Sequence, residues 1–157
     1  MPPNHASQPT VRAQQVRLVQ LAARAALVIL MALSIGGCSI SVDTALAEKQ
    51  VPQFHALLDE GRTTEIYVEA SEDLKKATTE ADFVAVLDAV HRKLGAVQKT
   101  EKQTWNVNYH TSGTFATLVY KTQYAGGEAT ETFVYRITNE SALLAGYHIN
   151  SNALIIK

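Results

Sequence analysis

The chain has no acidic residue before Asp43, although Arg12, Arg17 and Arg24 all precede that position. It holds a single cysteine in 157 residues, which excludes an intramolecular disulfide framework and a metal site built from several cysteines. From residue 38 onward the chain carries 11 of its 14 basic residues and all 15 acidic ones. This acidic excess disfavours general binding to nucleic acid, whose phosphates require a basic surface.

Sequence motifs with a known chemistry are also missing. There is no glycine-rich phosphate loop and no Gly-x-Ser-x-Gly nucleophile elbow. The histidines after Cys38 are scattered, and no two of them share a close helical spacing: His55, His91, His110 and His148. We interpret them as surface or rim histidines rather than as metal ligands. The sequence therefore predicts no cofactor, no metal centre and no catalytic residue.

The N-terminus has the organisation of an export signal. Residues 1–24 are polar and basic, residues 25–35 are almost entirely apolar, and small residues follow. The segment Ile35-Gly36-Gly37-Cys38 resembles the lipobox of bacterial lipoproteins, with an aliphatic residue and two small residues before the cysteine. That resemblance implies cleavage before Cys38, a diacylglycerol on its thiol and, often, an acyl chain on the freed amine. Two or three chains anchor a protein stably in a membrane.

The same resemblance carries an expectation about location. Ser39 follows the cysteine, and in lipoproteins of two-membrane bacteria a residue other than Asp at that position implies sorting to the outer membrane, facing the periplasm. The alternative is an uncleaved transmembrane anchor. Residues 25–42 are uncharged and reach the low end of the ~17–25 residues that a spanning helix needs, but glycines and serines dilute their second half.

We divide the chain into a signal peptide at 1–37, a lipidated cysteine and tether at 38–50, and one folded domain at 51–157. The first half of the domain is predicted to be helical. Helix 80–94 has the clearest signals, because Thr79 and Asp82 form a capping-box pattern. Gly95 would end this helix. One face of it is expected to be buried: Phe83, Val86, Leu87, Val90 and Leu94.

The second half of the domain changes to the two-residue period of β-strands. Strands are predicted at about 96–109, 114–124, 129–138 and 142–150, with a continuation toward Ile156. Gly126-Gly127 is a typical two-residue hairpin turn. Pairing across this turn places Tyr120 opposite Phe133 on an apolar face and Lys121 opposite Thr132 on the other face. The expected fold is α+β, with N-terminal helices on one face of a four-stranded antiparallel meander.

This order of elements resembles the cystatin-like and NTF2-like group of folds, in which helices fill the concave side of a curved sheet. The resemblance rests on the element order, on the helix end Lys93-Leu94-Gly95 and on the last strand, Ala145-Gly146-Tyr147-His148-Ile149. It implies a small bacterial lipoprotein of uncharacterised function. It transfers no catalytic residue.

Aromatic residues are concentrated in the strands, and they allow two interpretations. They line a ligand pocket on the concave side, or they form a core against which the helices pack, and we favour the core. The candidate pocket residues are Trp105, Tyr109, Tyr120, Phe133, Tyr135 and Tyr147.

Three functions remain open from the sequence. The leading hypothesis is an envelope-anchored, non-enzymatic module that binds an unknown envelope protein or ligand. The alternative is a small-ligand pocket protein or an isomerase-like enzyme of the NTF2-like type, which needs a cavity of a few hundred Å³. The third is an accessory subunit whose partner adds a strand to an exposed sheet edge, for which Leu154-Ile155-Ile156 is the candidate.

Overall fold

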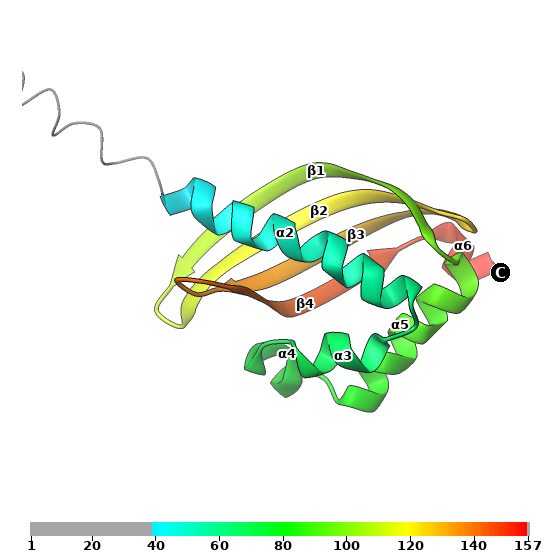
Figure 1. The fold of residues 1–157 in the computed structure, drawn as a ribbon, viewed down its shortest axis with the longest axis horizontal. Helices are drawn as coiled ribbons and strands as arrows, with labels where there is room; N and C mark the ends of the chain where they lie inside the picture. The colour runs from blue at the N-terminus through cyan, green and yellow to red at the C-terminus, as the bar shows by residue number, and fades with distance from the viewer. Residues whose placement is uncertain (1–38, 157) are drawn as a thin grey trace, which may run out of the picture. The chain divides into compact units, whose positions relative to one another are not determined.

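The computed structural model describes residues 39–156, with side chains from residue 44 onward (Figure 1). The predicted signal peptide and Cys38, where we predict lipidation, lie outside these described residues. Helices come first and strands follow, as the sequence predicts, so the α+β class is confirmed. The elements are α2 (Ser39–Asp59), α3 (Thr63–Val68), α4 (Glu72–Ala77), α5 (Glu80–Leu94), β1 (Val97–His110), β2 (Gly113–Tyr124), β3 (Gly127–Ile137), β4 (Ala142–Asn150) and α6 (Asn152–Ile156).

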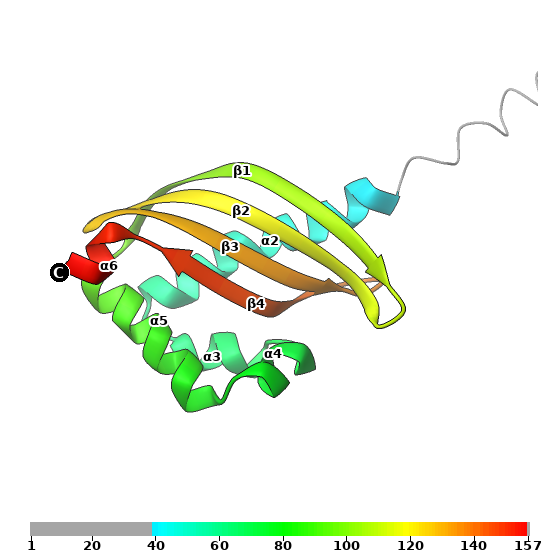
Figure 2. The ribbon, with the colours of Figure 1, turned by 180° about the vertical axis from the view of Figure 1, so that it is seen from behind.

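The strands form one antiparallel meander in the order β1-β2-β3-β4. The sheet curves around α2, which lies across its concave face, and α3, α4 and α5 extend this helical layer (Figure 1). From behind, no helix stands in front of the strands (Figure 2). The hydrophobic core therefore lies between the sheet and α2, where Val51, Leu58, Leu118 and Phe133 are almost fully buried.

Helix α5 confirms the strongest local prediction. It spans Glu80–Leu94, the Thr79 hydroxyl accepts a hydrogen bond from the Asp82 N–H at 3.2 Å, and Gly95 has a positive φ of 70°. One residue of the predicted buried face is placed differently, because Val86 is 51 % exposed. Val86 lies one helical step, ~100°, from the buried Leu87. The buried stripe is too narrow to include both residues.

Helix α2 begins earlier than the sequence suggested. Residues 39–50, for which we predict a tether, form its first half. The buried stripe continues backward from Val51 to Ala47, which is fully buried, although Ala47 contributes little to a hydrophobic pattern. Pro52 is typical of a first helical turn and favours a start near residue 51. In the structure it lies inside the helix, so packing on the sheet outweighs the hydrogen bond that proline removes.

The β2–β3 hairpin has the predicted faces but not the predicted register. Tyr124 pairs with Gly127, so the turn residues are Ala125 and Gly126. Tyr120 is consequently opposite Glu131 rather than Phe133, and the faces survive because the error is two residues. Gly126 is required by a close approach: a Cβ there would lie 2.7 Å from the Lys93 carbonyl oxygen at the end of α5.

Strand β4 ends sooner than the expected continuation toward Ile156. The chain turns at Ser151 into α6, so Leu154, Ile155 and Ile156 are helical and do not form a sheet edge. The Lys93 ammonium donates to the Leu154 carbonyl at 2.6 Å and ties α6 to α5. Strand addition at this segment is therefore excluded.

Candidate functional site

A fully buried carboxylate, Glu131 on β3, is the centre of the polar interactions in the core. Its Oε1 accepts hydrogen bonds from the hydroxyls of Tyr124 and Tyr147, each at 2.7 Å. Its Oε2 lies 2.9 Å from Nε2 of His55 and also accepts from the Thr122 hydroxyl. We call these five residues the Glu131 cluster. They come from α2, β2, β3 and β4, so the cluster links the main helix to three strands.

The electrostatics of the cluster favour a charged Glu131. Burial by itself would raise the pKa of this carboxyl group, but hydrogen bonding and the charge of His55, with further hydrogen bonds from Thr122 and Tyr147, bring the pKa below its usual range. Burial, together with the Glu131 charge, raises the pKa of the Tyr124 and Tyr147 hydroxyls. These phenols therefore remain protonated donors.

The Glu131 carboxylate is inaccessible to solvent, and its hydrogen-bonding capacity is filled by protein groups. Glu131 is 0 % exposed, and each of its oxygens accepts two hydrogen bonds from protein groups. A carboxylate used as a general base must reach a proton on a substrate, directly or through one water. In this conformation Glu131 has neither access nor a spare acceptor site. The arrangement fits a structural role in joining α2 to the sheet.

Four of the six candidate pocket residues come together in the core, where their rings pack on Phe133. Its centroid lies 5.3 Å from that of Tyr147, 6.0 Å from Tyr120 and 6.2 Å from Tyr135. Phe54 of α2 inserts among these rings at 5.1 Å from Phe133. Tyr120, Phe133 and Tyr147 thus contact one another or α2 and do not line an open space. Tyr135, by contrast, also lines the pocket described below.

The other two candidate pocket residues, Trp105 and Tyr109, lie apart from this group on β1. They are 47 % and 55 % exposed. Strand pairing places Trp105 opposite Leu118, which faces the helices, so both rings project on the helix-covered side of the edge strand.

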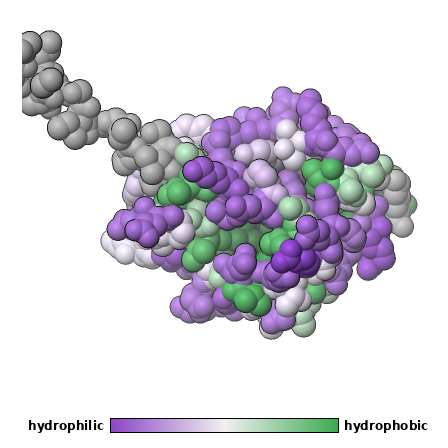
Figure 3. Space-filling view, viewed as in Figure 1, coloured by the Kyte–Doolittle hydropathy of each residue, from purple (hydrophilic) through white to green (hydrophobic). Residues whose placement is uncertain are grey.

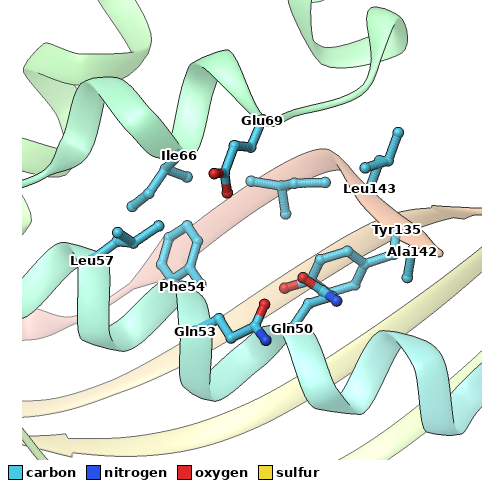
Figure 4. A pocket seen from close by; sticks show the side chains of 10 residues that line it. Gln50, Gln53, Phe54, Leu57, Ile66, Glu69, Tyr135, Ala142 and Leu143 are labelled. Carbon is cyan, nitrogen blue, oxygen red and sulfur yellow. The ribbon is translucent and has the colours of Figure 1, made fainter.

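A separate pocket opens between α2, α3 and β4 and encloses about 90 Å³. Tyr135 lies at its floor, 2 % exposed, and its hydroxyl has no hydrogen-bond partner among the described residues. Figure 4 shows this hydroxyl on the side of Gln50 and Gln53. We call this site the Tyr135 pocket. Its lining residues are Gln50, Gln53, Phe54, Leu57, Ile66, Glu69, Tyr135, Ala142, Leu143 and Leu144.

The rim of the Tyr135 pocket is polar and its interior is apolar. Gln50, Gln53 and Glu69 supply amide and carboxylate groups, and the Glu69 carboxylate points toward Phe54 (Figure 4). Hydrophobic surface is visible in a hollow between hydrophilic side chains on this side of the molecule (Figure 3). Among the lining residues there is no lysine, arginine or histidine.

A bulge in β4 shapes this pocket. Val134 pairs with Gly146 but Tyr135 pairs with Leu144, so Ala145 is the extra residue. Phe133 pairs with Tyr147 on one side of the bulge, and Ile137 pairs with Ala142 on the other. The shift buries Leu144 and leaves Leu143 on the rim, 38 % exposed.

The histidines differ from our expectation at one position. His55 is buried in the Glu131 cluster and is not a surface or rim residue, whereas His148 on β4 is exposed as predicted. Within residues 39–156 no three His, Cys, Asp or Glu side chains are grouped to hold a metal ion. None of the helices in that range has both the length and the apolar character needed to cross a membrane.

Glu131 and His55 were missed as partners by sequence reasoning, although one signal was present. Glu131 occupies the same alternating face of β3 as Ala129, Phe133 and Tyr135. An acidic residue at an inward position of a strand needs a buried partner, because an unpaired buried charge is costly. His55 follows the core residue Phe54 directly, but its orientation toward Glu131 depends on how α2 crosses the sheet.

A comparison with protein families identifies the class of domain. The family model described as "Protein of unknown function (DUF4019)" matches residues 50–147. The chain belongs to this family. The matched segment contains all residues of the Glu131 cluster and of the Tyr135 pocket. No curated protein matches the chain.

Proposed function

We propose that this chain is an envelope lipoprotein, anchored through Cys38, whose domain binds a partner protein and catalyses no reaction. The unpaired Tyr135 hydroxyl at the floor of the Tyr135 pocket carries the binding proposal. A buried polar group without a partner costs ~1–3 kcal/mol. A partner that forms a hydrogen bond with this hydroxyl recovers that free energy. The unpaired hydroxyl therefore favours binding of a partner in the pocket.

The size of the pocket favours a side chain of a protein over a free small molecule. Pockets for drug-sized ligands usually enclose ~300–1,000 Å³, and the Tyr135 pocket encloses about 90 Å³. That space accommodates the end of one side chain. Single side chains that fill pockets at the centre of an interface often dominate its binding energy.

The lining indicates which side chain fits. Phe54, Leu57 and Leu144 would contact an apolar stem, and the Tyr135 and glutamine oxygens would accept hydrogen bonds from its end. The Glu69 carboxylate adds a negative charge at the rim, with no cation among the lining residues to oppose a positive group. A lysine or arginine side chain of the partner has this combination of stem and donor.

The alternative function is a small-ligand pocket protein or isomerase-like enzyme of the NTF2-like type. The resemblance to that type of fold rests on the order of helices and strands. This function requires a larger cavity on the concave side of the sheet. There the Phe54 ring lies 4.7 Å from the Tyr147 ring and 5.1 Å from the Phe133 ring, so the space is filled by side chains. The buried carboxylate is also sealed, which disfavours catalysis by Glu131.

Photocrosslinking in cells tests the binding proposal. A photoreactive phenylalanine analogue at Leu143, on the rim, should form a discrete crosslink to one envelope protein. The same analogue at Val86, an exposed apolar position on α5 away from the pocket lining, is the matched control and should not. A crosslink at Val86 and none at Leu143 would place the partner on another surface.

Tyr135→Phe provides the second test, because it removes the hydroxyl and keeps the ring. The variant should lose most of the Leu143 crosslink and retain its folding stability. Unchanged crosslinking would show that the partner does not use the hydroxyl. The anchor is tested separately: intact-mass analysis should show a protein that begins at acylated Cys38, and a species retaining residues 1–37 would favour the transmembrane alternative.

A further inference from the structure

Helix α2 leaves no free linker between the proposed anchor and the domain. It begins at Ser39, the residue after Cys38. A lipid on Cys38, which is part of the function proposed above, would therefore be attached directly to a rigid helix that is packed on the sheet. A domain anchored in this way stays next to the bilayer instead of extending away from it on a tether.

One ion pair shows which part of the sheet lies near the anchored end of α2. The Lys102 ammonium on β1 contacts the Glu48 carboxylate on α2 at 2.6 Å. From this contact, Ser39 is about 14 Å away along the helix at ~1.5 Å per residue. In Figures 1 and 2 the start of α2 and the β1–β2 hairpin lie at the same end of the domain. Measured toward that end, at ~3.3 Å per residue, Trp105 is roughly 10 Å and Tyr109 roughly 23 Å from Lys102. The level of Ser39, where α2 begins, falls between these two aromatic residues.

Trp105 and Tyr109 have the properties of residues that enter a bilayer interface. They are 47 % and 55 % exposed, and they lie on the same face of β1 with the half-buried Val107 between them. Tryptophan and tyrosine are enriched at the level of lipid headgroups, where one part of the ring system is apolar and another is hydrated.

The charges of this region are compatible with an anionic lipid surface. Between Glu101 and Glu128 the chain contains no Asp or Glu. His110 lies at the hairpin end of β1, whereas the two lysines of this interval are already paired, Lys102 with Glu48 and Lys121 with Glu128. From the other elements, Glu48 faces β1 but is paired with Lys102, and Glu140 lies in the exposed β3–β4 turn.

We propose that the lipid bilayer is the partner of this surface: Trp105 and Tyr109 enter the headgroup region beside the lipidated end of α2 and hold the β1 edge of the domain on the membrane. The domain then has a defined orientation. A second protein covering the two rings is the competing occupant.

Trp105 is the only tryptophan of the chain, so its fluorescence reports directly on this surface. The full lipoprotein is reconstituted into vesicles of phosphatidylethanolamine and phosphatidylglycerol, with some acyl chains brominated near their carbonyl ends. The Trp105 emission should shift to shorter wavelength, and the brominated lipids should quench more than half of it. Tyr109→Ser should reduce both effects.

A matched reporter separates insertion from general proximity to the vesicle. In a Trp105→Phe, Val86→Trp variant the single tryptophan lies on α5, at a position with a similar exposed fraction. Its emission should remain unshifted and unquenched. Equal quenching of the two reporters, or no quenching of Trp105, would overturn the inference.

Flotation and intact mass keep the two proposals distinguishable. A protein that floats with the vesicles and carries acyl chains, yet leaves Trp105 unquenched, contradicts only the membrane contact. A protein that carries no acyl chain contradicts the lipoprotein proposal itself. If Trp105 is protected from a water-soluble quencher but not reached by brominated lipid, a second copy of the chain covers the surface and the bilayer is not its partner.

Discussion

Two buried regions on the same face of β3 differ in whether their tyrosine hydroxyls have hydrogen-bond partners. In the Glu131 cluster, the hydroxyls of Tyr124 and Tyr147 both donate to a carboxylate. Four residues further along the strand, the Tyr135 hydroxyl has no partner among the described residues. The hydroxyls of Tyr124 and Tyr147 therefore stabilise the fold. The Tyr135 hydroxyl makes no such contribution and is available to a binding partner.

The physical difference lies in what stands opposite each hydroxyl. α2 brings His55 over Glu131, and the neighbouring strands add Thr122 and two phenols, so every oxygen is used. At Tyr135, residues of α2, α3 and β4 leave a pocket, and the glutamines that line it form no hydrogen bond with the hydroxyl. Unsatisfied buried polar groups in native proteins are rare, and each calls for an explanation.

Removing the Glu131 carboxylate should have the largest effect. Glu131→Ala removes the buried acceptor shared by His55 and three hydroxyls, and removing one member of a buried, hydrogen-bonded charged pair costs about 3–5 kcal/mol. Urea denaturation of the protein lacking residues 1–37 measures the loss. The control is Glu128→Ala on the same strand, where the carboxylate forms an exposed ion pair with Lys121, and the change should stay within ~0.5 kcal/mol. Similar losses for both variants would contradict the structural role of the cluster.

Acid should weaken the same region selectively. The pKa of Glu131 is lowered in the folded protein, so its contribution is present above the pKa of an unfolded glutamate, ~4.3, and is lost as the pH falls through the lower folded value. The wild-type protein should therefore lose free energy of unfolding below about pH 4. Subtracting the profile of Glu131→Gln isolates this component, because Asp73, whose pKa is lowered by hydrogen bonds from Arg136, titrates in both proteins. Parallel profiles would show that Glu131 binds its proton equally well folded and unfolded.

The tyrosine hydroxyls permit a direct test of the contrast. Tyr124→Phe removes one donor from the buried charge while keeping the ring, and hydrogen bonds to charged groups are worth about 1.5–3 kcal/mol. Thermal or urea unfolding should show a loss in that range. A neutral result would mean that the charge is satisfied by its remaining three donors.

Tyr135→Phe should have the smallest effect, and its sign is the informative part. Because the hydroxyl lacks a partner, its removal should leave the free energy of unfolding unchanged or raise it by up to about 1 kcal/mol. The same unfolding measurement applies. A loss comparable to that of Tyr124→Phe would show that the hydroxyl is paired in solution, and the Tyr135 pocket would lose its claim as a binding site.

Local signals were sufficient for several elements. The Thr79 cap, the spacing of Phe83, Leu87 and Val90, and Gly95 predicted α5 at its observed bounds. Strand alternation predicted the buried face of β2 and β3 even though the turn was misplaced by one residue. A two-residue register error leaves side chains on the same face, so burial was correct where pairing was not.

Other features depended on contacts that no local pattern contains. The first half of α2 has few large apolar residues, yet Thr44 and Ala47 within it are buried against the rest of the domain. The bulge at Ala145 changes which leucine of β4 is buried. Neither can be read from one segment, because each depends on the space that a distant element leaves.

The sequence by itself determined the α+β order, the α5 helix and the two faces of the sheet, since periodicity and caps act over a few residues. It also contained, unrecognised, an acid at an inward position of β3. Only the tertiary structure decided that His55, 76 residues away in the chain, would pair with Glu131 and that the Tyr135 hydroxyl would have no hydrogen-bond partner among the described residues. Pairing of buried polar groups depends on distances of a few ångströms between separate elements, and these distances are set by how α2 packs on the curved sheet.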